Sequence, residues 1–225
     1  LEAANRLRDR TWVGNGLHAN QSLCLNAGDW QAARDFVDRG LAISSRDRRL
    51  LCSRTILEYE LGEFVQGEPY LQSLLATIPD SEAGVGVDYL AATVPVIARI
   101  AGISDSLLDK TKDSAQIVLS SPSTNPNTAR IIRAGLALLA EVQQDLEYAK
   151  EQYHSLESAR GTQVLLPHVS VDRMLGILSH TMGNLDQAPH HFEDALAFCR
   201  KAGPARTRLG LLRLRRYPPP TEQFR

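Results

Sequence analysis

A short phrase of residues recurs along the chain and constrains its fold more than any other feature. Each copy has a small or polar residue, a polar residue and a large apolar residue, with a small residue three places after the last of these. The third copy lacks the large apolar residue. The copies begin 34 to 42 residues apart, at Gly28, Gly62, Gly102, Gln144 and Gly183. A period of this size predicts a stack of repeated units rather than one continuous core.

The residues around each phrase predict two helices joined by a tight turn. Ala33, Val37 and Leu41 follow Gly28 at four-residue steps, which is the spacing of one helix face. Glycine tolerates the left-handed backbone that ends a helix, and Asp29 or Asn184 can cap the helix that follows. The small residue of the phrase then lets the second helix approach the first closely. The fold class that we predict is all-α.

Breaks in the helical pattern divide the chain into predicted units. The best loop is residues 120–127, because two prolines and six Ser, Thr or Asn residues propagate neither regular structure. There we expect Asn127 or Thr128 to cap the next helix. Pro95 leaves two alternatives open, a kink inside its helix or the first turn of that helix. Residues 1–203 are predicted as a helical repeat array, with units near 14–47, 48–81, 88–122, 130–163 and 169–203.

The units resemble the tetratricopeptide repeat family, whose members stack helix pairs into a right-handed superhelical array, an α-α solenoid. Two units carry the resemblance best. In 48–81 it rests on Gly62, Phe64, Gly67, Tyr70 and Pro79. In the last unit it rests on Leu175, Gly176, Gly183, Ala188, Phe192 and Ala195. After that unit the pattern stops, and residues 204–225 form a basic, proline-rich, atypical tail.

Two stretches also look like the repeat tails of large bacterial signalling proteins, in which an ATPase or a nucleotide cyclase precedes the array. They are residues 27–35 and 191–203. This likeness implies an alternative function, that of a regulatory or sensor tail of such a protein. The catalysis of those relatives does not transfer, because neither catalytic module is present in this sequence.

Composition and motifs argue against several other functions. Apolar residues make up 43% of the chain, and 25 basic against 26 acidic residues leave a formal charge of -1, so no overall field favours nucleic acid. The arginines of the tail are read as a solvated terminus: Arg206, Arg208, Arg213, Arg215 and Arg216. No phosphate-binding loop or hydrolase motif occurs. We therefore expect neither an enzyme nor a cofactor.

The expected location is the cytoplasm, without a membrane anchor. Cys24, Cys52 and Cys199 are odd in number and far apart, which fits no disulfide framework, and we expect buried, unreactive thiols. The longest mainly apolar run, residues 89–98, is well short of the roughly 20 residues that span a bilayer.

Neither metal binding nor ligand stacking is expected from the remaining candidate residues. His191 and Glu193, in the His-rich stretch with His180 and His190, would point apart on a helix, so no metal site is predicted. The large apolar residues of the phrases occupy equivalent places in their units. We therefore expect them to belong to the core: Trp30, Phe64, Leu146 and Leu185.

The resemblance implies a binding surface on the concave face, lined by the first helix of each unit. Its positions map onto ten mixed polar residues: Asn15, His18, Ser22, Asn26, Arg49, Tyr59, Glu60, Arg99, Arg173 and His180. The family's clamp for acidic C-termini needs Asn at each ninth position. This chain has other residues there: Ser22, Ile56, Val96, Leu138 and Ile177. We therefore expect a noncatalytic scaffold whose groove takes a helix, an extended peptide or a neighbouring domain.

Overall fold

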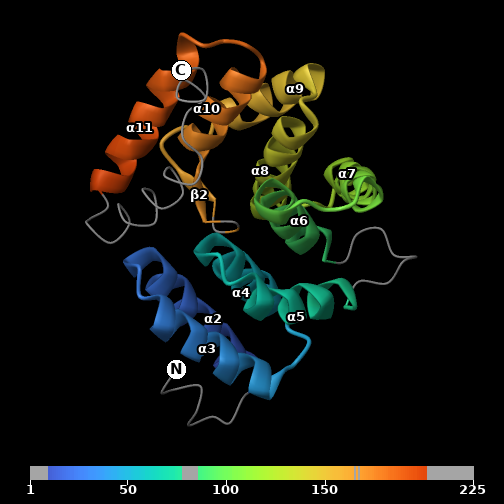
Figure 1. Ribbon diagram of the computed structural model, residues 1–225, viewed down its shortest axis with the longest axis vertical. Coiled ribbons are helices and arrows are strands. Elements are labelled where there is room, and N and C mark those ends of the chain that lie inside the picture. The colour runs from blue at the N-terminus through green and yellow to red at the C-terminus, as the bar shows by residue number, and fades with distance from the viewer. Residues whose placement is uncertain (1–9, 78–85, 165, 167, 202–225) are drawn as a thin grey trace.

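The computed structural model describes residues 10–77, 86–164, 166 and 168–201, and ten helices lie within these ranges (Figure 1). The predicted tail 204–225 and Pro79 lie outside the described residues. The helices are α2 (Arg10–Ala27), α3 (Trp30–Ile43), α4 (Arg48–Leu61), α5 (Phe64–Leu75), α6 (Val87–Ala101), α7 (Asp105–Leu119), α8 (Pro126–Gln143), α9 (Leu146–Glu157), α10 (Val171–Thr181) and α11 (Gln187–Lys201).

Consecutive helices pack as pairs, which confirms the prediction of an all-α chain built from helix pairs. The pairs are α2 with α3, α4 with α5, α6 with α7, α8 with α9, and α10 with α11. From the second pair to the last, the first helices are in contact, because α6 packs against both α4 and α8, and α8 also packs against α10. The first two pairs meet through α3 and α4 instead, and α9 packs against α10 as well. The largest apolar core cluster follows this contact from α4 to α10. The unit boundaries themselves stay a prediction.

The turns within the pairs have the backbone that the phrases predict. Gly28, Gly62 and Gly183 have positive φ angles of 74°, 87° and 78°. Gln144 takes the equivalent place in the fourth pair and is also left-handed, with φ 52°. The side chain of Asp29 accepts a hydrogen bond from the Ala32 amide at 3.0 Å and so caps α3, as expected.

The small residue of the phrase sits where the two helices of a pair touch. Ala33, Ala149 and Ala188 are buried. At Gly67 of α5, an added Cβ would lie 2.7 Å from the ring of Tyr59 on α4. This distance is far below van der Waals contact, so α5 lies this close to α4 because residue 67 has no side chain.

The expectation that the large apolar residue of the phrase belongs to the core was wrong for three of its four examples. Phe64, Leu146 and Leu185 are 43%, 56% and 62% exposed, and only Trp30 is half-buried. These side chains stand at the turn, where the second helix begins and the first has ended. Little surface of the partner helix is available there to cover them.

Pro95 lies inside α6 as its ninth residue, and it explains a close contact with α8. Proline has no amide hydrogen, so the carbonyl of Ala91 loses its helical donor. Gly135 of α8 packs directly against this carbonyl, and an added Cβ there would lie 1.7 Å from the Ala91 oxygen. The backbones of α6 and α8 are therefore in contact at this point.

Two local predictions near the loops were wrong. Asn125, rather than Asn127 or Thr128, caps α8, and its side chain accepts from the Thr128 amide at 2.9 Å. Pro126 then occupies the first helical position, where no amide donor is needed. The link between α9 and α10 also contains a short antiparallel ribbon that the sequence did not predict, formed by β1 (Gln163–Val164) and β2 (Val169–Ser170).

The ribbon reaches back to the first helix pair. Gln163 Nε2 donates a hydrogen bond to Asn26 Oδ1 on α2 at 3.2 Å. Val164, Leu166 and Val169 are buried in the main core cluster. The row of pairs is therefore bent, because a segment preceding the last pair touches the first pair, and Figure 1 shows β2 between α10 and α4.

Candidate functional site

The structure gathers six of the ten predicted groove residues into two polar clusters. All ten belong to the first helices α2, α4, α6 and α10. One cluster, called here the α2/α4 cluster, contains Asn15, His18 and Arg49 together with Asp47. The other, called the Glu141 cluster, contains Arg99, Arg173 and His180 around Glu141.

Arg49 organises the α2/α4 cluster from the start of α4. Its Nη1 donates to Asn15 Oδ1 at 2.7 Å, and its Nη2 lies 2.7 Å from Asp47 Oδ2. Asp47 caps α4 by accepting from the Arg49 amide at 3.0 Å. Burial raises the pKa of Asp47, but its hydrogen bonds and the Arg49 charge outweigh this effect, so the pKa is lowered overall. The carboxylate therefore stays charged at neutral pH.

His18 lies in the same cluster and is held in its neutral form. Burial, together with the charge of Arg49, lowers its pKa below the ordinary value, and Asp47 opposes this only in part. Its Nε2 is buried without a hydrogen-bond partner. The neutral imidazole suits this place because a charged one would face a neighbouring guanidinium.

A hollow of about 340 Å³ opens beside this cluster, where α2, α3 and the start of α4 meet. Arg49 and Asp47 contribute its charged wall. Small and mixed residues form the remainder: Thr11, Gly14, Gly40, Ile43 and Ser44. The cavity is large enough for a side chain of a partner, and its charged groups are already neutralised by each other.

The Glu141 cluster combines side chains from three helix pairs. Arg99 Nη2 of α6 lies 3.0 Å from Glu141 Oε1 of α8. Burial raises the pKa of Glu141, and the positive charges of Arg99, His180 and Arg173 oppose this rise. Its Oε2 is buried without a hydrogen-bond partner. Arg99 thus pairs directly with this carboxylate, and the charges of Arg173 and His180 on α10 also influence it.

Glu141 was missed by the sequence reasoning, although the signal was present. Arg99 and His180 were selected because they fall at the twelfth position of their predicted units. The same count in the unit 130–163 falls on Glu141. Applying the rule to every unit would therefore have found the acidic centre of the cluster.

The other predicted residues are not part of either cluster. Tyr59 is 4% exposed and donates a hydrogen bond to Glu68 Oε2 at 2.6 Å, so it lies inside the α4/α5 pair. Asn26 holds the β1–β2 ribbon, while Ser22 and Glu60 are half-buried. Residues 50–59 of α4 are buried throughout. The part of the predicted surface that solvent can reach therefore lies toward the ends of the first helices.

Of the three cysteines, only Cys52 is buried as expected, whereas Cys24 and Cys199 are half-buried. Burial raises the pKa of Cys52 to about 12. Thr93 Oγ1 donates to the Cys52 sulfur at 2.9 Å. Such a thiol stays protonated at neutral pH and behaves as a small buried apolar group.

Comparison with known proteins yields no relative, because no family model, no curated protein and no solved structure matches the chain. Within the described ranges, none of the helices combines the length and the apolar character needed to cross a membrane.

Proposed function

We propose that the chain is a noncatalytic scaffold that binds a peptide or a neighbouring domain on the surface of its first helices. The observation that supports this most is the Glu141 cluster, in which three successive helix pairs contribute to one polar site. Sites assembled from several stacked units are how helical repeat arrays recognise extended partners. The alternative, a regulatory tail of a larger bacterial ATPase or nucleotide cyclase, would use the same surface within one protein.

We further propose that the pairs form a right-handed, tetratricopeptide-like superhelical array. The succession of first-helix contacts from α4 to α10 supports this arrangement, as does the buried small residue between the helices of four of the five pairs. In such an array the first helices lie on the inner side, where residues from distant parts of the sequence meet. Dispersed cysteines that form no disulfide support a cytoplasmic location.

The side chains of the Glu141 cluster suit a partner with acidic groups. Arg99 and Arg173 both act on the carboxylate of Glu141, since burial raises its pKa and their charges lower it. A carboxylate from a peptide can share Arg99 and Arg173 with Glu141, because a guanidinium has several donors in a planar fork. Such pairing gives specificity and speeds association more than it adds raw affinity.

A peptide library displayed against the purified protein tests this function. We expect selected peptides to be enriched in Asp and Glu, and the Arg99→Gln/Arg173→Gln variant to bind a selected peptide about tenfold more weakly. The control replaces two exposed arginines outside the cluster, Arg130→Gln/Arg200→Gln, and should bind as the wild type does. Equal binding by the two double variants, or a library without any acidic enrichment, would refute the proposal.

A further inference from the structure

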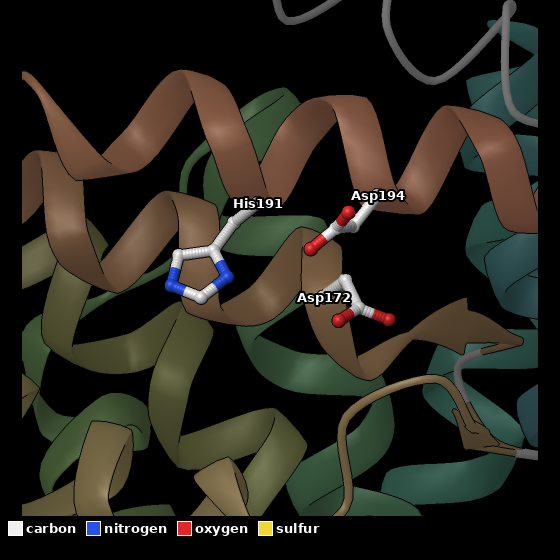
Figure 2. Close-up of side chains that lie close together, drawn as sticks. All are labelled: Asp172, His191 and Asp194. Carbon is white, nitrogen blue, oxygen red and sulfur yellow. The ribbon is translucent and has the colours of Figure 1, made fainter.

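Three side chains of the last helix pair converge outside the surface described above (Figure 2). Asp172 is in the first turn of α10, while His191 and Asp194 lie three residues apart on one face of α11. One atom of each side chain, a carboxylate oxygen or a ring nitrogen, lies within 4.8 Å of the other two. These residues are called here the α10/α11 triad.

His191 is buried, and one of its ring nitrogens lacks a partner. The residue is 2% exposed. Its Nε2 is 3.0 Å from Tyr153 Oη, which also accepts a hydrogen bond from Gln187 Nε2 at 2.7 Å. Its Nδ1 has no hydrogen-bond partner, and Figure 2 shows this side of the ring turned toward the two aspartates.

Neither neutral form of His191 satisfies this arrangement. With the proton on Nε2, that nitrogen donates to Tyr153, and the lone pair of Nδ1 faces two carboxylates. With the proton on Nδ1, the donor has no acceptor within hydrogen-bond geometry. A cation placed between Nδ1 and the carboxylates satisfies all three groups, whereas a packing role leaves Nδ1 unexplained.

Asp172 and Asp194 are paired only incompletely with Arg160, which lies on the turn after α9. Its Nη2 is 2.9 Å from Asp194 Oδ2, but its Nε is 3.8 Å from Asp172 Oδ1. The Arg160 side chain is 52% exposed, whereas that of Asp172 is 3% exposed. The amide of Gly161 donates to Asp172 Oδ2 at 2.9 Å and fixes this carboxylate. Arg160 is therefore a solvent-exposed counter-ion beside a buried acid.

We infer that the α10/α11 triad binds a divalent transition-metal ion, with Zn²⁺ as the best fit, and that Arg160 gives way when the ion enters. One imidazole nitrogen and two carboxylates form a mixed N/O ligand set that Zn²⁺ accepts at about 2.0 to 2.2 Å. Ligands around such an ion lie roughly 3.4 Å apart, so the triad needs only a small contraction. Tyr153 and Gly161 act as the outer contacts that orient the ligands.

The ion would join the two helices of the last pair, because Asp172 belongs to α10 and the other two ligands to α11. Three protein ligands leave a fourth position of a tetrahedral ion for water. The role that we assign to the ion is to hold α10 and α11 together, since its ligands come from both helices, while the 51% exposed Asp194 side chain leaves the fourth position open to water. Binding should therefore raise the unfolding temperature.

Titration of the purified, metal-free protein with Zn²⁺ tests the inference, by calorimetry and by the shift in unfolding temperature. We expect one ion per chain. His191→Gln and Asp194→Asn should each weaken binding at least about tenfold, while Arg160→Gln should tighten it, because the competing cation is gone. The matched controls are the exposed neighbours on α11, His190→Gln and Glu193→Gln, which should bind as the wild type does.

A purely structural ion pair gives the opposite pattern. Arg160→Gln would then lower the unfolding temperature and create no zinc affinity. The inference is overturned if neither the wild type nor the Arg160→Gln variant binds Zn²⁺ saturably, or if the His190→Gln control loses as much affinity as His191→Gln. Co²⁺ provides a second readout, because its visible absorption strengthens when it passes from water to a tetrahedral protein site, and Asp194→Asn should abolish that change.

Discussion

Glu58 brings a negative charge into the interior of α4, where its side chain is 0% exposed. Arg34 of α3 donates from Nε to Glu58 Oε1 at 2.8 Å. Arg54, one turn earlier on α4, lies over the ring of Tyr70 and donates to Asp38 Oδ1 at 2.9 Å. This network joins the first two helix pairs through charged groups rather than through apolar packing alone.

Removing the carboxylate of Glu58 should therefore destabilise the protein strongly. Arg34 and Arg54 both form ion pairs with Glu58. Glu58→Ala removes this shared anion from the two guanidinium groups, and we expect the free energy of unfolding to fall by about 3 kcal/mol. Urea denaturation measures this change. Glu63→Ala is the control, since Glu63 is exposed and its side chain makes no capping bond, and a loss of similar size there would contradict the argument.

His18 should make stability depend on pH near neutrality. Folding lowers its pKa below the ordinary 6.5, so the unfolded chain binds more protons than the folded one as the pH falls past that value. The contribution of neutral His18 is fully present above pH 6.5 and is lost on acidification toward its lower folded pKa. In the His18→Gln variant, the unfolding temperature should change less with pH between pH 7.5 and 5.5 than in the wild type. The pKa of His191 is lowered too, so part of the slope should remain.

At the scale of elements, the contact between α6 and α8 depends on one glycine. Gly135→Ala places a methyl group against the Ala91 carbonyl, and backbone atoms cannot rotate away as a flexible side chain can. We expect a loss of about 3 kcal/mol in unfolding free energy, measured by thermal or urea denaturation.

Gly14→Ala in α2 is the matched control for that substitution. Nothing lies within 4 Å of a Cβ added at this position. The change should therefore stabilise the protein by about 0.5 to 1 kcal/mol, since alanine costs less conformational entropy in a helix. If Gly135→Ala and Gly14→Ala changed the free energy of unfolding in the same direction, helix propensity rather than contact between α6 and α8 would govern position 135.

Local rules predicted the pairs well because the groups involved are close together in sequence. The left-handed glycines and the Asp29 cap need only a turn of backbone to act. The same rules do not distinguish Gly135 from Gly14, because both are helical glycines and only the neighbouring helix decides what a methyl group would meet. The α10/α11 triad was not predicted from the sequence for a similar reason, since Asp172 approaches His191 only after α10 and α11 have paired.

At the scale of the whole molecule, the predicted groove is the part that the sequence described least well. Position counts found the side chains of the Glu141 cluster on α6 and α10, because unit spacing sets which helix end a residue occupies. They also selected Tyr59, whose side chain points into its own pair. Position counts do not show which side of α4 is covered by α5, and the close approach at Gly67 places α5 over Tyr59. Repeat arithmetic therefore gives the level of a residue along a helix better than the direction of its side chain.

The hydrogen bond between Gln163 and Asn26 joins residues 137 positions apart, whereas the turns and pairs are formed by near neighbours in sequence. A row of helix pairs can begin to fold anywhere and extend by adding the next pair. The contact of the ribbon with α2 cannot form in this way, because it requires all the intervening pairs to be in place and their curvature to be set. The helix pairs therefore form from residues that are near in sequence, and the contact between the ribbon and α2 forms last.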